Sequence, residues 1–267
     1  MGDYIGAYNG NIVFPKSLYT KDVKIEAVAY SLSLNCRFCG HTLHMWSVAQ
    51  HSLLVDYIIQ NSDIASEAES NGLSIDMLRL LGLLHDASEA YLSDICRPIK
   101  VTLPDYTKYE KHTQNKILLA FGIYSNGIDR YTKFIRKADD IALYNEAEVL
   151  MNPNSTWRND YRDGFELLEK YKFTEMIKMQ NPQVVKSVFL YRVHQLVESL
   201  NLDNAPFEDI EKYYTNSDYI PIIECGECLG YIIDTSDEYK VKPFNDDKIV
   251  DIPKKEADNR FDLSDWV

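Results

Sequence analysis

Apolar residues recur at helical spacing along most of the first 200 residues. In these segments every third or fourth position is apolar, so one face of each helix can be buried. The helices predicted in this way span residues 22–34, 47–59, 76–91, 106–121, 129–151, 161–178 and 182–200. Ser47 is placed to cap the second helix, and Pro182 fits the first turn of the last one. The pattern therefore predicts a mainly α-helical core.

The stretches between these helices have other patterns. Three glycines and a proline punctuate residues 1–21, which predicts an extended leader. Residues 61–74 are polar and predict a loop or an irregular helix. Residues 94–104 contain two prolines and predict a loop.

The composition changes after residue 204. Three β-rich runs follow, separated by glycines and by Asp/Ser clusters: Tyr219–Ile223, Leu229–Ile233 and Tyr239–Val241. We therefore divide the chain into a helical core at residues 1–204 and a small, acidic, β-rich extension at residues 205–267. Because the extension has few apolar residues, we expect it to pack against the core or against a neighbouring subunit of a homo-oligomer.

The charge of the chain limits its partners. Its 267 residues are 45% hydrophobic, enough for a core, and its formal net charge is −13. An acidic surface repels a phosphate polymer, so we expect no nucleic-acid partner, whereas a metal ion can still attract a small anion. No apolar run approaches the ~20 residues of a membrane span, and no basic, apolar signal segment opens the chain. We expect a cytoplasmic protein without a membrane partner.

Metal-ligating side chains lie on helix faces that should point inward. His51, His85 and Asp139 each share a face with apolar residues three to seven positions away, and Asp86 follows His85 directly. Burying such groups is costly unless they pair or bind a metal ion. Imidazole nitrogens and carboxylate oxygens together suit a divalent cation, such as Mn²⁺, Co²⁺, Zn²⁺, Fe²⁺ or Mg²⁺.

The same residues could also have a purely structural role without a metal ion. One histidine on an apolar face is more often a hydrogen-bonded core residue than a ligand, and a His-Asp pair also arises by chance. Here, however, Glu89 follows Asp86 by three positions, and Asp94 comes shortly after. The dense acidic cluster at the end of a very apolar helix favours a functional site.

Five segments in order resemble the HD-domain phosphohydrolases and, among them, the 5′-deoxynucleotidase-type branch with its phage-encoded relatives. They are CysArgPheCysGlyHisThr (36–42), SerValAlaGlnHisSer (47–52), LeuLeuHisAspAlaSerGluAlaTyrLeuSerAsp (83–94), ArgProIleLys (97–100) and LysAlaAspAspIleAlaLeu (137–143). The match extends over about residues 5–200. The resemblance implies an HD-domain helical bundle, located in the host cytoplasm if the chain is phage-encoded.

The resemblance also implies a ligand set. His51, His85, Asp86 and Asp139 match the metal-binding residues of that family. Asp139 is preferred to Asp140 because the family's last aspartate follows an alanine.

Further residues match the family's catalytic and substrate-binding positions. Glu89 matches a catalytic acid that orients or deprotonates the attacking water, and Asp94 matches a second acidic residue near the scissile phosphate. Arg37 matches an arginine that grips phosphate. Further candidates on the substrate side are Lys100 and Arg97 for phosphate, and Trp46 and Gln50 for base or sugar. Trp46 fits a core position equally well.

The cysteines argue for no additional site. Cys36/Cys39 and Cys225/Cys228 have CxxC spacing but lie far apart in sequence, so we expect free thiols rather than a shared zinc site. Cys39 stands where many members of the family described above have glycine, and Cys96 stands where many of them have proline. Both changes fall in loops that shape the substrate pocket.

These features predict a divalent-metal-dependent phosphohydrolase of (deoxy)nucleotides. We expect it to remove the 5′-phosphate of a (deoxy)nucleoside monophosphate by attack of a water activated at the metal. Release of triphosphate from a deoxynucleoside triphosphate such as dATP is the close alternative. A non-catalytic HD protein that binds nucleotides is a further one, against which the complete ligand set argues. Hydrolysis of a cyclic or signalling nucleotide fits the same ligands.

Overall fold

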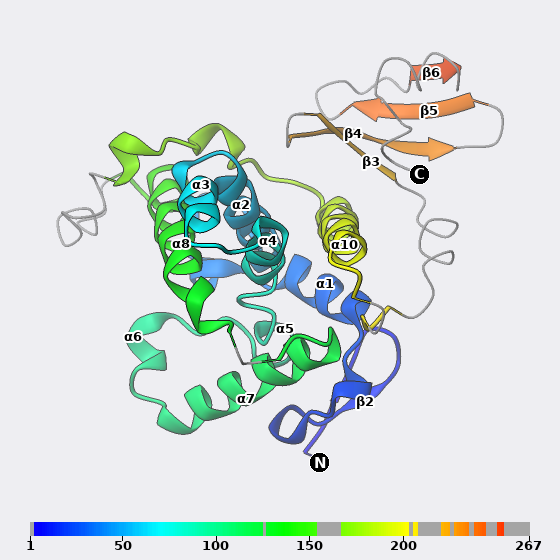
Figure 1. Cartoon of the computed structure of the whole chain (residues 1–267). Helices are drawn as coiled ribbons and strands as arrows, with labels where there is room; N and C mark the ends of the chain where they lie inside the picture. The colour runs from blue at the N-terminus through cyan, green and yellow to red at the C-terminus, as the bar shows by residue number, and fades with distance from the viewer. Residues whose placement is uncertain are drawn as a thin grey trace. The chain divides into compact units, whose positions relative to one another are not determined.

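A computed structural model describes residues 3–124, 127–153, 167–202 and 205–207, and the backbone of four strands between residues 220 and 253. The chain forms two compact units, Met1–Phe207 and Glu208–Val267. The first unit is mainly helical, as the periodicity predicts (Figure 1). Its α-helices are α1 (Ile25–Leu34), α2 (Val48–Gln60), α3 (Asp63–Ser70), α4 (Ile75–Leu83), α5 (Glu89–Leu92), α6 (Arg97–Lys100), α7 (Pro104–Ala120), α8 (Asp129–Leu150) and α10 (Pro182–Ser199).

Short elements complete the first unit. The leader forms a two-stranded antiparallel sheet of β1 (Ile5–Gly6) and β2 (Ile12–Val13). Single 3-10 turns follow in the leader (Pro15–Ser17, Thr20–Asp22), after α1 (Arg37–Gly40) and before α10 (Thr174–Met176). An isolated bridge between Cys36 and Ser47 closes the loop that joins α1 to α2. This closure places the two ends of the loop side by side at the start of α2.

Helix α2 lies at the centre of the first unit and packs against α1, α3, α4, α8 and α10. Its start is fixed by a reciprocal capping box, in which the Ser47 side chain accepts from the Gln50 backbone N–H and the Gln50 side chain accepts from that of Ser47. Two clusters of buried apolar residues flank α2, one toward α1 and α10 and the other toward α3 and α8. Val48 and Ala49 at the start of α2 belong to the first cluster, and Leu54, Val55, Ile58 and Ile59 further along it belong to the second.

Two predicted helices are shorter than the periodicity indicates. The helix predicted at 76–91 ends at Leu83, so His85 and Asp86 lie in turns and not in a helix as predicted. The physical reason is that His85 Nδ1 lies 2.7 Å from the Gly82 carbonyl oxygen, the group that an Asp86 N–H would bind in a continuing helix. The chain then turns tightly, with the Glu89 N–H donating to the Asp86 carbonyl.

The helix predicted at 161–178 also ends early within its described part, residues 167–178. Only residues 167–170 are helical there, followed by the 3-10 turn at 174–176. The Asn145 side chain donates to the Tyr171 carbonyl and accepts from the Phe173 N–H, so it takes the backbone groups that would continue the helix. The segment at 61–74, predicted as a loop or an irregular helix, contains the short helix α3. The segment at 94–104, predicted as a loop, contains the short helix α6.

The second unit contains an antiparallel sheet with the order β3-β4-β5-β6. Its strands are β3 (Ile220–Glu224), β4 (Glu227–Asp234), β5 (Glu238–Pro243) and β6 (Val250–Pro253). The three predicted β-rich runs fall on β3, β4 and β5, whereas β6 is not evident in the sequence pattern. Among the helices of the described residues, none combines the length and the apolar character needed to cross a membrane.

Candidate metal centre

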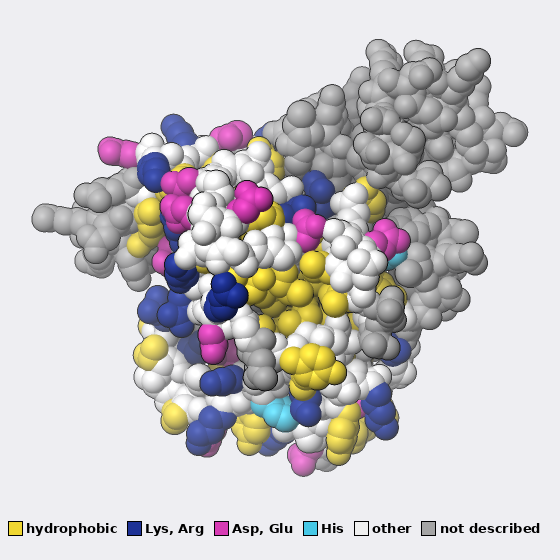
Figure 2. All heavy atoms as spheres, in the orientation of Figure 1, with side chains coloured by type: hydrophobic (Ala, Val, Ile, Leu, Met, Phe, Trp, Pro, Cys, Tyr) yellow, Lys and Arg dark blue, Asp and Glu magenta, His cyan; other side chains and the backbone are white. Residues whose placement is uncertain are grey.

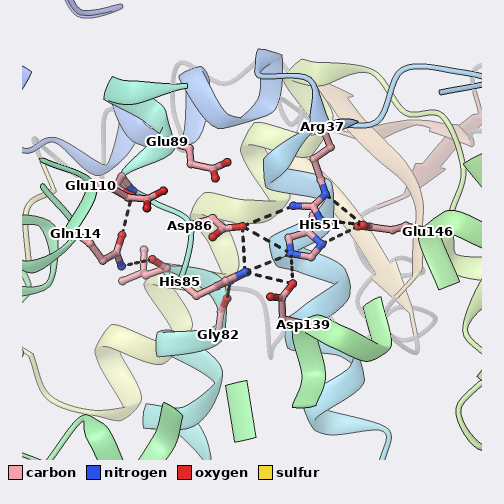
Figure 3. A network of polar contacts seen from close by, with 12 residues as sticks. Arg37, His51, Gly82, His85, Asp86, Glu89, Glu110, Gln114, Asp139 and Glu146 are labelled. Atoms are coloured by element: carbon pink, nitrogen blue, oxygen red, sulfur yellow. Dashed lines mark hydrogen bonds and ion pairs between the residues drawn. The ribbon is translucent and has the colours of Figure 1, made fainter. Parts of the chain in front are cut away.

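Three elements bring imidazole and carboxylate groups to one point (Figure 3). His51 comes from the first turn of α2, His85 and Asp86 from the turns after α4, and Asp139 from α8. His51 Nε2 lies 3.3 Å from His85 Nε2 and 3.1 Å from Asp139 Oδ1. His85 Nε2 lies 3.9 Å from the same Asp139 oxygen. These three side chains could hold a metal ion.

The spacing of these atoms fits a divalent cation. Two ligands that are each about 2.1 Å from an ion lie roughly 3.0 Å apart in octahedral and roughly 3.4 Å apart in tetrahedral geometry. The distances from His51 to His85 and to Asp139, 3.3 and 3.1 Å, lie within this range, and the distance from His85 to Asp139, 3.9 Å, is longer. Asp140, the neighbour that the resemblance rejects, is exposed.

Asp86 lies at the edge of this group. Its Oδ2 is 3.1 Å from His85 Nε2 and 3.8 Å from His51 Nε2, so it faces the same point as the three other side chains (Figure 3). Burial opposes its charge, but His85, His51 and Arg37 hold the pKa of Asp86 well below its usual range. Burial also opposes a charge on His85, yet Asp86 and Asp139 raise the pKa of His85 to about 9. These neighbours therefore favour a positive charge on His85 beside the two carboxylates.

Glu146 is a site residue that the sequence analysis missed. It lies two turns after Asp139 on α8, and its side chain is fully buried. Glu146 Oε1 is 2.7 Å from His51 Nδ1 and accepts from Trp46 Nε1 at 2.8 Å. Its Oε2 accepts from Arg37 Nε at 3.2 Å and lies 3.1 Å from Arg37 Nη2. The only signal in the sequence is a carboxylate on the apolar stripe of α8, four positions from both Ala142 and Leu150.

Glu89 lies beside the ligand group in a desolvated position. Its side chain is 4% exposed, and Oε2 is buried without a hydrogen-bond partner. Burial and the neighbouring carboxylates of Asp86 and Asp94 raise the pKa of Glu89 to about 9, so the acid is protonated at neutral pH in the metal-free protein. Glu89 also lines a cavity of about 600 Å³ between the leader, α1 and α5.

Asp94 and Lys100 lie on the same side of the cluster as Glu89. Burial raises the pKa of Asp94, opposed by Arg37 and Lys100 and reinforced by Asp86. Lys100 Nζ lies 2.6 Å from Glu110 Oε1 and 3.7 Å from Glu89 Oε1. The predicted catalytic acids and one predicted phosphate-side cation are thus neighbours.

The other predicted substrate residues lie differently. Arg37 has its Nε–Nη2 edge bound to Glu146, so that edge is not available to grip phosphate as predicted, and its Nη1 lies 3.6 Å from Asp86 Oδ2. Arg97 is exposed on α6. Trp46 and Gln50 are buried, and their polar atoms bind Glu146, Ser47 and the Lys178 carbonyl. This geometry does not support a pocket lined by Trp46 and Gln50.

Cys36, Cys39 and Cys96 are free thiols. Cys39 has a left-handed backbone with a φ of 52°, a conformation that glycine adopts without strain, which explains the glycine expected at this position. Cys96 has a φ of −55°, which proline also adopts. Cys225 and the side chain of Cys228 lie outside the described part of the chain. The backbone at these two positions is therefore one that glycine and proline, respectively, also adopt.

Comparisons with known proteins find partial similarity. No family model matches the chain. The uncharacterised protein YfdR of Escherichia coli (strain K12) is 34% identical over 120 residues, 45% of this chain and 59% of that protein. An uncharacterised protein of Rhodobacter capsulatus is 27% identical over 193 residues, 67% of this chain and 88% of that protein. A 5′-deoxynucleotidase of Yersinia pestis is 35% identical over 77 residues, 27% of this chain and 39% of that protein.

The similarity to the 5′-deoxynucleotidase, a relative of stated activity, covers 27% of this chain and about two fifths of that protein. The match to YfdR spans about three fifths of the length of YfdR. All three relatives are bacterial proteins, and their names give no support to a phage-encoded origin.

Proposed function

We propose that this chain is a divalent-metal-dependent phosphohydrolase of the HD-domain class. In this proposal it removes the 5′-phosphate of a (deoxy)nucleoside monophosphate. The observation that carries the proposal is the convergence of His51, His85, Asp86 and Asp139 with Glu89 beside them. The partial similarity to 5′-deoxynucleotidases supports the choice of substrate class.

The ligand residues and the acid have separate roles in this proposal. His51, His85, Asp86 and Asp139 would hold the cation, which when bound polarises a phosphoryl oxygen and lowers the pKa of water. Glu89 lies three positions after Asp86 and has no imidazole contact among the described residues, so it is placed to exchange a proton with water or substrate. Asp94 adds a second carboxyl group on the same side.

The charges around the site favour a monophosphate over a triphosphate. Lys100 is paired with Glu110, and the Nε–Nη2 edge of Arg37 is paired with Glu146. Asp86, Asp94 and Asp139 add negative charge that a long polyphosphate would meet. A monophosphate carries less charge and needs fewer free cations.

A phosphate-release screen tests the proposal. Nucleoside and deoxynucleoside mono- and triphosphates would be incubated with Mn²⁺, Co²⁺, Zn²⁺ or Mg²⁺, and free phosphate measured with and without added pyrophosphatase. We expect phosphate from monophosphates in the absence of pyrophosphatase. Release from triphosphates that depends on added enzyme would instead show a triphosphohydrolase, and no release from any nucleotide would favour a binding protein.

Neighbouring aspartates provide a matched control for this screen. Asp139→Ala removes a proposed ligand, whereas Asp140→Ala removes the exposed carboxylate next to it on α8. We expect the first variant to lose phosphate release and the second to keep it. Equal activity of the two variants would contradict the ligand assignment or reveal a contaminating phosphatase.

A further inference from the structure

Glu146 is a buried carboxylate that joins the proposed metal ligand His51 to Arg37, a largely buried arginine. It lies 95 positions after His51 and 109 after Arg37, so the tertiary fold alone brings them together. Both of its oxygens are engaged, Oε1 with His51 and Trp46 and Oε2 with Arg37. Neither the sequence pattern nor the named relatives assign a role to it.

The orientation of the His51 ring makes Glu146 important. The imidazole has its Nε2 toward His85 and Asp139 and its Nδ1 toward Glu146 (Figure 3). An ionised carboxylate only accepts hydrogen bonds, so the 2.7 Å contact requires a proton on Nδ1. A neutral imidazole with its proton on Nδ1 has its lone pair on Nε2, the atom that faces the other ligands.

The two other partners keep Glu146 in place. The Arg37 guanidinium supplies a positive charge to a carboxylate that has no access to water, and the Trp46 indole N–H occupies a further acceptor position of Oε1. The side chain of Arg37 is itself only 11% exposed. Rotation of the carboxylate would leave at least one of these donors without a partner.

We propose that Glu146 is a positioning residue that holds His51 in the Nδ1–H tautomer, and thereby presents Nε2 to a divalent cation. This inference rests on the proposed metal site but not on the identity of the substrate. A carboxylate behind a metal-binding histidine fixes both the ring and its tautomer, and its loss typically lowers metal affinity ~10–100-fold.

The variant Glu146→Gln separates this role from simple space filling. Its amide has nearly the same shape but one acceptor oxygen and one donor nitrogen. If the oxygen accepts from Arg37, the NH₂ group faces His51 and donates to Nδ1. The imidazole proton then moves to Nε2 and occupies the atom that should bind the cation.

A second buried carboxylate on the described chain supplies the matched control. Asp56 on α2 is 3% exposed, and its Oδ1 accepts from Arg79 Nε at 2.8 Å, but it contacts no proposed ligand in the described structure. Asp56→Asn therefore also disrupts a buried carboxylate–arginine pair. We expect it to lower stability and to leave metal affinity unchanged.

Two measurements on the full chain test the inference. The affinities for Zn²⁺ and Mn²⁺ would be measured by competition with a chelator for wild type, Glu146→Gln and Asp56→Asn. Nitrogen-15 spectra of the histidine rings would be recorded for the zinc-loaded wild type, and for metal-free proteins at alkaline pH. We expect ~10–100-fold weaker metal binding only in Glu146→Gln. We also expect Nδ1–H on His51 in wild type and Nε2–H in Glu146→Gln.

Specific results would overturn the inference. Zinc bound through His51 Nδ1, or wild-type metal affinity in a folded Glu146→Gln, contradicts it. The wild-type spectrum tests the tautomer of His51 even if the Glu146→Gln variant does not fold. Metal binding with Nδ1–H on His51 but without nucleotide hydrolysis supports this role and rejects the proposed function. Nucleotide hydrolysis by a Glu146→Gln protein with unchanged metal affinity supports the proposed function and rejects the positioning role of Glu146.

Discussion

Glu89 and Asp86 are three positions apart, yet their surroundings give them opposite charge states. Asp86 faces two imidazoles and Arg37, which keep it ionised despite its burial. Burial and the carboxylates of Asp86 and Asp94 raise the pKa of Glu89, and Lys100 and Arg37 lower it less. The result, about 9, favours the protonated acid at neutral pH. Their environments therefore shift the two pKa values in opposite directions, which agrees with the separate roles proposed for the two residues.

Substitution at these two residues should have different effects. We expect Glu89→Ala to retain the cation and to lose turnover by about 10²–10⁴-fold, the typical contribution of general acid–base help. Asp86→Ala should lose both cation and turnover. Metal content by mass spectrometry and kcat would be measured on the same samples, with Glu89→Gln as the variant of matched size. An empty site in Glu89→Ala would make Glu89 a ligand and contradict the assignment.

At the scale of elements, close helix packing places the proposed ligands. Gly82 on α4 has no side chain where a Cβ atom would lie 2.7 Å from Ile59 Cδ1 of α2. The same glycine provides the carbonyl that His85 Nδ1 contacts. The approach of α4 to α2 thus sets the separation of His85 from His51.

A double-mutant cycle tests this packing. Gly82→Ala should destabilise the protein by about 1–2 kcal/mol, because overpacking outweighs the gain in helix propensity. Ile59→Val removes Cδ1 and should cost about 0.5–1.5 kcal/mol alone. The double variant should be more stable than the sum of the two effects, as measured by urea unfolding. Strict additivity would show that the two side chains do not compete for one space.

Helix α3 is fastened to α8 and to the residues after it through Asp63. The carboxylate accepts from Lys137, Lys170 and the Tyr171 hydroxyl, and these bonds hold the pKa of Asp63 well below its usual range. Asp63 is about one-third exposed, so solvent weakens the effect.

The stability contributed by Asp63 should depend on pH. A lowered pKa in the folded state means that the contribution is complete above the unfolded pKa, about 3.9, and is lost as the pH falls toward the folded pKa. We expect Asp63→Asn to lower the free energy of unfolding by roughly 1 kcal/mol at neutral pH. The difference from wild type should shrink below about pH 4, and a difference that grows there would contradict this assignment.

At the scale of the whole molecule, the helical unit extends to Phe207. Phe207 packs against the apolar cluster of α1 and α10 and against the His194 ring, and the Ile25 N–H donates to the Pro206 carbonyl at 3.3 Å.

Apolar side chains gather in the middle of one face of this unit, with acidic and basic side chains around them (Figure 2).

Truncation at two positions tests the role of the second unit. A chain ending at residue 207 should keep the helical fold, the metal affinity and the turnover per metal-loaded site. A chain ending at residue 204 should unfold at a lower temperature because it loses the contacts of Pro206 and Phe207. Thermal melts, sizing and metal titration would compare the two. Loss of turnover in a folded, metal-loaded 1–207 chain would show that the second unit completes the active site.

Helical periodicity alone predicted several helices of the first unit and the direction of two side chains of the candidate site. The bounds of α2, α8 and α10, with Ser47 at one start and Pro182 at another, follow from local spacing and capping. The direction of His51 and Asp139 toward a common point follows from the same spacing, because a regular helix sets the direction of each side chain.

Only the tertiary structure decided the contacts that complete the site. The turn at His85 depends on a side chain that competes for a backbone carbonyl, and the end of the segment at 167–170 depends on Asn145 from α8. Glu146 meets Arg37 and His51 from about 100 positions away. Such pairings have no local period in the sequence, since they depend on how helices pack and on which buried polar groups must find a partner.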